Sequence, residues 1–234
     1  MEMVKKTITH AVIKDIEIDV CYPKSRGNES FIGVYDIGDE DSCKNVINFT
    51  NKTIEDLSNG KIVENVALDQ TVGKKGHYEK GLLAREDVGL FINDNNINEG
   101  IVSLNKWLQI GFEQYIEKYH IDIILNSYHT KIHKVVPPAG GYHSWHSEQA
   151  HGSENSSRYL TWIIYLNDVD PKDGGETEFK FQGIKLIPKT GRVVIWPAGC
   201  THLHRGNAAW AEKYYVTGWF ECDNNVDNST TQFV

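Results

Sequence analysis

Beyond residue 120, short β-branched and aromatic segments alternate with turn residues, and this alternation constrains the fold most. Residues 130–136, 159–167 and 213–221 are rich in Val, Ile, Tyr, Trp and Thr, which favour strands. Pro-Pro-Ala-Gly-Gly at 137–141 and DVDPKDGG at 168–175 supply turns between them. The pattern predicts roughly seven strands in this part of the chain.

The chain before residue 121 shows helical periodicity. Residues 41–60 place apolar side chains near helical spacing between an acidic start and an Asn-Gly end. Residues 97–119 carry a longer apolar stripe, which consists of Ile101, Leu104, Leu108, Phe112, Tyr115, Ile116 and Tyr119. Because such a stripe needs an apolar surface to pack on, we expect these helices to lie on a sheet.

Helices followed by strands with frequent turns are typical of a supported sandwich. We predict a mainly β protein with supporting α-helices, whose core is a double-sheet sandwich or a double-stranded β-helix (jelly roll) with the N-terminal helices packed on one sheet. The 234 residues are expected to form a single domain. It is expected to divide into an N-terminal helix-and-strand support at 1–120, a jelly-roll core at 121–222 and an Asn-rich tail at 223–234.

Composition argues against several classes of function. The formal net charge of −8 disfavours a nucleic-acid partner, because phosphate binding depends on clustered Lys and Arg. The four cysteines have neither metal-pair nor dense disulfide spacing, which indicates free thiols in a reducing compartment. No apolar run has the length of a secretory signal or a membrane span. We expect a cytoplasmic protein without a membrane partner, either a monomer or a small homo-oligomer.

Two histidine-rich segments, GYHSWHSE and THLHRG, are candidates for chemistry. Residues i and i+2 of an extended strand point to the same side, so His146 and Glu148 can present a nitrogen and an oxygen to one centre. Either histidine of THLHRG would complete the two-His-one-carboxylate set that leaves positions open on Fe(II). Since His-x-Glu is common by chance, a solvent-facing loop stays an alternative.

The order of the motifs resembles the 2-oxoglutarate- and Fe(II)-dependent dioxygenases, specifically their prolyl 4-hydroxylase-like branch. The matching pieces are GYHSWHSE, RYLTWIIYLNDVDPKDGGETEF, IPKTGRVVIWPAGCTHLHRGN and KYYVTGWF. They lie within residues 133–220, whereas the N-terminal third matches only loosely, in its helices and AREDVGLFI. The resemblance implies Fe(II), 2-oxoglutarate as cosubstrate and O2, with ascorbate as a candidate further cofactor.

Carried over residue by residue, the resemblance makes His146, Glu148 and His204 the metal ligands. Lys213 is expected to bind the far carboxylate of 2-oxoglutarate. It lies nine positions after His204 and eleven after His202, and the family spacing fits His204 better.

The resemblance also gives roles to two residues of the pocket. Thr161 matches a hydroxyl that helps to hold the same carboxylate as the lysine, and Trp219 matches an aromatic residue that lines the pocket.

The chain departs from the family in two places. Glu148 stands where most of the branch has Asp, so its reach to the metal must be offset by the backbone position. The loop 149–158 matches no substrate residue of the family.

Two residues near the ligands have alternative expected roles. His143 is expected to touch substrate, to lie behind the metal ligands, or to be a solvated loop histidine. Arg205 is expected to contact an outer carboxylate or to form a surface ion pair.

We expect a dioxygenase that hydroxylates an unactivated C–H bond, most simply of a peptidyl proline, while 2-oxoglutarate is decarboxylated to succinate. The same chemistry on a free amino acid or another small molecule is an alternative. A catalytically silent jelly-roll protein that binds a metal or ligand is a second alternative. A zinc hydrolase ranks below these, because it leaves Lys213 and Thr161 without a role.

Overall fold

The computed structural model describes residues 19–25, 27–69, 85–149 and 156–222. Two long helices, α1 (Glu40–Ser58) and α2 (Glu99–Tyr119), confirm the helices expected from periodicity. Each begins at a side-chain cap: Asp39 accepts from the Ser42 amide, and Asn98 accepts from the amides of Gly100 and Ile101. Neither helix in the described part of the chain has the length and apolarity of a membrane span.

The main layer is a nine-stranded sheet with antiparallel pairing throughout. In spatial order its strands are β1 (Asp19–Cys21), β4 (Gly33–Asp36), β14 (Arg192–Pro197), β11 (Arg158–Tyr165), β16 (Lys213–Cys222), β9 (Thr130–Val135), β7 (Val88–Ile92) and β5 (Val66–Leu68), with β8 (Leu125–Asn126) paired to β16. The expected N-terminal support and the expected core therefore contribute strands to the same sheet.

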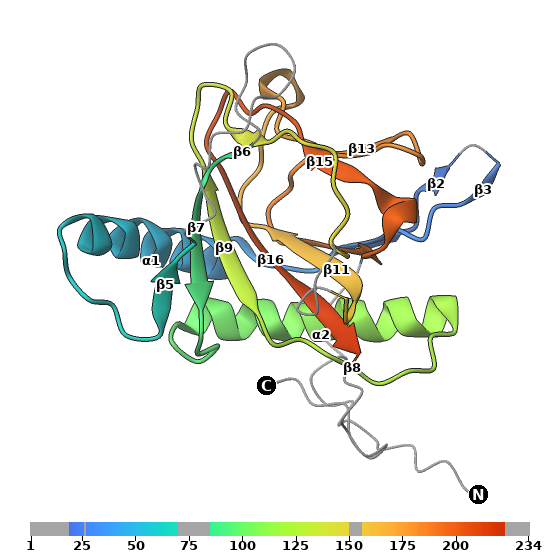
Figure 1. Cartoon of the computed structure of the whole chain (residues 1–234), viewed down its shortest axis with the longest axis horizontal. Coiled ribbons are helices and arrows are strands. Elements are labelled where there is room, and N and C mark those ends of the chain that lie inside the picture. The colour runs from blue at the N-terminus through green and yellow to red at the C-terminus, as the bar shows by residue number, and fades with distance from the viewer. Residues whose placement is uncertain (1–18, 26, 70–84, 150–155, 223–234) are drawn as a thin grey trace, which may run out of the picture.

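A second, smaller layer faces the main sheet. It consists of β13 (Ile184–Leu186), β12 (Thr177–Phe179) and β15 (His204–Gly206), with the short pair β10 (Gly141–Tyr142) and β6 (Arg85–Glu86) beside it, and a hairpin of β2 (Lys24–Ser25) and β3 (Asn28–Glu29) at one side. Figure 1 shows β13 and β15 on the opposite side of β11 and β16 from the long helix α2. Two facing antiparallel layers with helices behind one of them confirm the predicted fold class.

Strand β11 explains how the sheet separates a core from a cavity. Its side chains alternate between the two faces, as the strand period of two requires. Trp162 and Ile164 join the large apolar cluster that contains the helices, whereas Ile163 and Tyr165 join the smaller cluster beneath β12. The residues from Leu160 to Tyr165 are all buried, so this strand packs on both of its faces.

Helix α2 is attached to the sheet by aromatic contacts. The rings of Phe112 and Phe220 stack with centroids 4.2 Å apart. Helix α1 packs against α2, and α2 in turn packs on β14 and β4. The apolar stripe of residues 97–119 therefore lies on the sheet face opposite the second layer.

Most of the β-branched segment 121–128 lies outside the strands. Only Leu125 and Asn126 form β8, because they pair with Cys222 and Glu221 at the very end of β16. The preceding residues follow the left-handed cap of α2 at His120 and leave Ile123 half exposed. The expected tail at 223–234 lies outside the described residues.

Gly218 in β16 provides a test of this packing. A Cβ atom there would overlap the carbonyl oxygen of His129 and the indole ring of Trp162. We expect Gly218→Ala to lower the free energy of unfolding by about 2 kcal/mol or more, because the crowded backbone and ring must shift. Urea denaturation measures this change.

Gly199→Ala is the matched control. Its backbone φ of −79° suits alanine, and the added Cβ would meet only the side-chain oxygen of Gln149, at 3.2 Å. Equal stability losses in the two variants would contradict the packing described here.

Candidate active site

A cavity of about 510 Å³ lies between the two layers. Side chains of β9, β11, β14 and β16 line it from the main sheet, and side chains of β12 and β15 line it from the second layer. Because alternate residues of each strand point into this space, residues far apart in the chain meet there. Thr161, Thr217 and Trp219 are examples from the two central strands.

The structure brings His146, Glu148 and His204 together at this cavity. One potential ligand atom from each lies within 4.8 Å of the others. The Nε2 atoms of His146 and His204 are each 3.4 Å from Oε1 of Glu148. These are the three residues that the sequence analysis selects as metal ligands.

Backbone hydrogen bonds fix the three ligand residues. The amides of His146 and His204 each donate to the other's carbonyl at 3.0 Å, and the amide of Glu148 donates to the carbonyl of Ala198 at 3.0 Å. The His-x-Glu segment is therefore an isolated bridge to β15, not the end of a regular strand as the sequence analysis assumes. The bridge still places a nitrogen and an oxygen on the same side.

The histidine rings are oriented for binding a cation. Nδ1 of His146 donates to the Ser144 carbonyl at 2.8 Å, and Nδ1 of His204 donates to the His202 carbonyl at 3.0 Å. Because a carbonyl only accepts, each Nδ1 carries a proton, and burial lowers the pKa of His204, which favours the neutral ring. Two Nε2 lone pairs and a carboxylate then point at one space. Such a donor set repels itself unless a cation lies between its members, so it fits a metal ion.

Lys213 provides a positive charge in the wall of the cavity. Its side chain is buried, and Nζ donates to the Gly175 carbonyl at 2.7 Å and lies 4.9 Å from the ring centroid of Tyr215. Burial lowers the pKa of Lys213 to about 8. Within the described residues no carboxylate lies at ion-pair distance from Nζ. A buried cation of this kind suits an anionic ligand.

Thr161 has unused hydrogen-bonding capacity on the same wall. Its Oγ1 is buried and has no hydrogen-bond partner among the described residues. The threonine lies opposite Trp219 of β16 and opposite Trp196 of β14, and all three line the cavity. A buried hydroxyl without a partner costs free energy, so a ligand oxygen in the cavity would satisfy it.

His143 and Arg205 are engaged with protein groups. Both ring nitrogens of His143 face carbonyl oxygens, at 3.2 Å from Gly206 and 3.0 Å from Ala139, and the ring is buried. This placement argues against both the substrate contact and the solvated-loop alternative. Arg205 lines the cavity but donates twice to Glu178, at 2.9 and 2.7 Å, as the ion-pair alternative expects.

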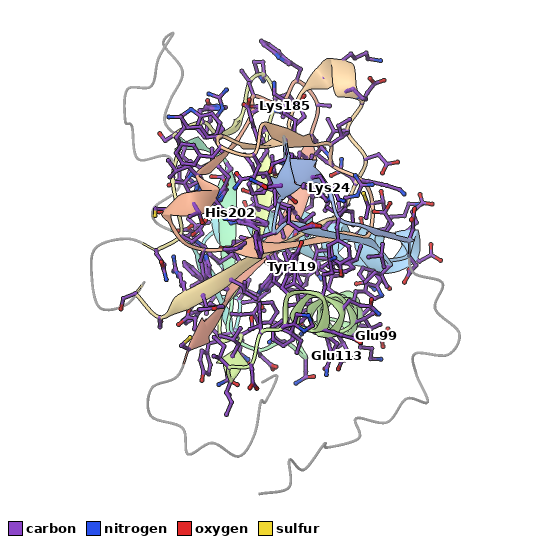
Figure 2. All side chains as sticks on the ribbon, turned by 90° about the vertical axis from the view of Figure 1, so that its right-hand side faces the viewer. Lys24, Glu99, Glu113, Tyr119, Lys185 and His202 are labelled. Atoms are coloured by element: carbon purple, nitrogen blue, oxygen red, sulfur yellow. The ribbon has the colours of Figure 1, made fainter. Side chains whose placement is uncertain are left out.

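His202 lies apart from the three candidate ligands, although it is only two residues from His204. It is buried in the short helix η3 (Cys200–His202), and its position is labelled in Figure 2. Its Nε2 bonds the carbonyl of Ser30 at 2.9 Å, and its Nδ1 bonds the hydroxyl of Thr201. Because His202 belongs to η3 and His204 begins β15, the two rings do not share the orientation that residues i and i+2 have within one strand.

A buried charge network forms the wall near β6, β7 and β9, and sequence reasoning missed most of it. Asp87 accepts from Arg85 Nε at 2.8 Å and lies 2.7 Å from His133 Nδ1. Asp69 lies 2.7 Å from Lys131 Nζ and 3.3 Å from an Arg85 nitrogen. The two carboxylates neutralise cations that line the cavity. In the sequence Lys131 and His133 stand at alternate positions of one segment, but no local pattern connects them with the two carboxylates.

Two further residues at the site had no predicted role. The ring of Tyr142 stacks on that of His146 with centroids 3.9 Å apart. Arg158 closes the loop that matched no family residue, and its guanidinium lies 3.5 Å from the ring centroid of Trp219. Aromatic and cationic residues near a ligand motif have no fixed spacing from it in the sequence. These contacts are therefore seen only in the folded chain.

Residues 130–221 match the family model described as the 2OG-Fe(II) oxygenase superfamily. No curated protein matches the chain.

Solved structures share the fold at low sequence identity. A viral collagen prolyl hydroxylase from Paramecium Bursaria Chlorella virus-1, solved as a 2OG complex, aligns with a TM-score of 0.60 and 16% identity over 83% of this chain and 97% of its own. A prolyl hydroxylase from Trichoplax adhaerens, in complex with a hypoxia inducible factor peptide fragment, aligns at 0.57 and 15% over 82% and 83%. A Pseudomonas putida prolyl-4-hydroxylase aligns at 0.53 and 17% over 78% and 88%.

The lowered pKa of Lys213 predicts how pH affects ligand binding. The ammonium group loses its charge above a pH of about 8. The affinity for 2-oxoglutarate should therefore fall about tenfold for each pH unit above this value. Titration calorimetry in the presence of Mn(II) measures the effect.

Lys213→Arg is the control for the pH experiment. A guanidinium stays charged throughout this range, so the affinity of the variant should not change with pH. A wild-type affinity that is constant up to about pH 9.5 would contradict the role of Lys213.

Proposed function

We propose that this protein hydroxylates peptidyl proline in a prolyl 4-hydroxylase-like reaction, and the match of residues 130–221 to the family model of the 2OG-Fe(II) oxygenase superfamily supports this proposal. The resemblance noted in the sequence is confirmed at the level of the family and of a dioxygenase. The observation that carries the proposal is the convergence of His146, Glu148 and His204 on one point of a cavity whose wall contains buried Lys213.

We propose that the three converging side chains hold Fe(II). Two neutral imidazoles and one carboxylate are the ligand set of non-haem iron oxygenases, and they leave further coordination positions open. Bound there with 2-oxoglutarate and O2, iron supplies the oxidative decarboxylation to succinate and the oxidation of a C–H bond. The carbonyl oxygens of Ser144 and His202 keep both rings in the tautomer that presents Nε2.

We assign Lys213 and Thr161 to the cosubstrate. The ammonium of Lys213 would form a charge-assisted hydrogen bond to the distal carboxylate, and low dielectric strengthens this bond. Thr161 would donate its unpartnered hydroxyl to an oxygen of the same ligand. The chain's own task is to fix the orientation of the cosubstrate and to exclude water around it.

Peptidyl proline is the substrate that we propose. The cavity lies in the size range of ligand sites, and beyond the polar ligands its lining includes the rings of Tyr142, Trp196 and Trp219. Such walls suit a compact apolar ring. The solved prolyl hydroxylases with this fold, one of them with a bound peptide fragment, support the choice by analogy.

Anaerobic titration of the purified protein with Fe(II) and then 2-oxoglutarate tests the assembly of the site. A chelated keto acid should give a weak visible charge-transfer band. The absence of the band would favour the catalytically silent alternative.

Mass spectrometry of reactions in air tests the substrate. It should detect the gain of one oxygen on proline-containing peptides. A gain only on free amino acids would favour the small-molecule alternative.

Replacement of the two neighbouring histidines tests the ligand assignment. His204→Ala should abolish succinate formation, because it removes a metal ligand. His202→Ala should retain much of the succinate formation, because among the described residues the His202 ring hydrogen-bonds the backbone of Ser30 and the hydroxyl of Thr201 and none of the three candidate ligands. The opposite result would show that the distal ligand is misassigned.

A further inference from the structure

The two oxygens of the Glu148 carboxylate have different partners. Oε1 faces the Nε2 atoms of His146 and His204, both at 3.4 Å. Oε2 points away from them and accepts from the indole Nε1 of Trp219 at 2.9 Å. A nitrogen of Arg158 lies 3.4 Å from the same Oε2. The carboxylate therefore has one oxygen directed at the proposed metal position and one held by the protein.

The two groups that hold Oε2 are themselves fixed. Trp219 is buried in β16, where its backbone lies opposite Thr161 of β11. The guanidinium of Arg158 lies on the face of the indole, 3.5 Å from the ring centroid, and also reaches the backbone carbonyl of Glu148 at 3.3 Å. Stacking of a guanidinium on an aromatic face is favourable, so each of these groups supports the position of the other.

The length of the Glu148 side chain makes this arrangement consequential. A glutamate has one more rotatable bond than an aspartate, so an unrestrained carboxylate could turn away from the histidines or present both oxygens to a cation. Each such motion would misorient the carboxylate at the metal. Hydrogen-bond partners of ligating carboxylates commonly prevent motions of this kind. In this chain the protein holds Oε2, which is the oxygen that does not face the proposed metal position.

We propose that Trp219 and Arg158 are positioning residues for the metal centre, which hold Oε2 of Glu148 so that Oε1 alone is offered to the ion. This inference rests on the proposed iron site and extends it to the indole N–H. It explains how a longer carboxylate serves at a position where the resemblance leads one to expect aspartate. It also gives Trp219 a role beyond that of an aromatic wall.

Trp219→Phe separates the two roles, because it keeps an aromatic ring in the wall and removes the indole N–H donor. We expect the affinity for Mn(II), measured from the electron paramagnetic resonance signal of the free ion, to fall about 10- to 100-fold. Trp210→Phe is the matched control, since the Trp210 side chain is exposed and does not line the cavity. Its affinity should equal that of the wild type.

A second pair of variants tests whether Trp219 affects the Mn(II) affinity through Glu148. In Glu148→Asp we expect the shorter carboxylate to bind the ion without reaching the indole, so that the hydrogen bond to Trp219 is lost. Adding Trp219→Phe to that background should then change the Mn(II) affinity less than about threefold. An equal loss in both backgrounds would place the action of Trp219 elsewhere and overturn the inference, as would a wild-type affinity in Trp219→Phe.

Arg158→Gln tests the contribution of the guanidinium to Mn(II) binding while the indole stays in place. It should weaken Mn(II) binding by less than Trp219→Phe does, because its contact with Oε2 is longer, and unchanged affinity would remove Arg158 from the proposal. Thermal unfolding of the metal-free proteins identifies any variant that has lost its fold. If the wild type itself binds no Mn(II), the proposed function fails; if it binds Mn(II) and Trp219→Phe binds equally well, only this inference fails.

Discussion

The reciprocal backbone hydrogen bonds between His146 and His204 are the constraint on which the site depends. They join a loop that follows β10 to the first residue of β15, and they set both imidazoles beside one carboxylate. The main sheet contributes indirectly, because Glu148 is fixed by the carbonyl of Ala198 just beyond β14. A centre built from three backbone-anchored side chains needs little rearrangement when an ion enters, which is the meaning of preorganisation in a metal site.

Charge in the cavity wall is distributed unevenly. Arg85, Lys131 and Arg205 line the cavity, but each has a carboxylate partner at ion-pair distance. Lys213 is buried with only a carbonyl and aromatic rings around its ammonium group in the described structure. Because an uncompensated buried cation is costly, an anionic ligand at this place would stabilise the wall. The neutralised cations shape the cavity without competing for that anion.

Much of the fold could be predicted from the sequence, because its long elements are strongly periodic. Helix α2 and strands β11, β14 and β16 follow from their apolar patterns. Short strands such as β4 depend on pairing with β14, a distant segment, and carry too few residues to show a period. At the site, spacing and resemblance selected His204 over His202. The contacts of Arg85 with Asp87 and of Trp219 with Glu148 arise only from tertiary pairing, which no local pattern encodes.

Anomalous diffraction at the iron edge, from crystals grown anaerobically with Fe(II) and 2-oxoglutarate, tests the central claim most directly. The account predicts one iron peak, bounded by Nε2 of His146, Oε1 of Glu148 and Nε2 of His204, with the keto acid extending from the ion toward Lys213. An iron peak at another group of side chains, or a keto acid that points away from Lys213, would contradict it.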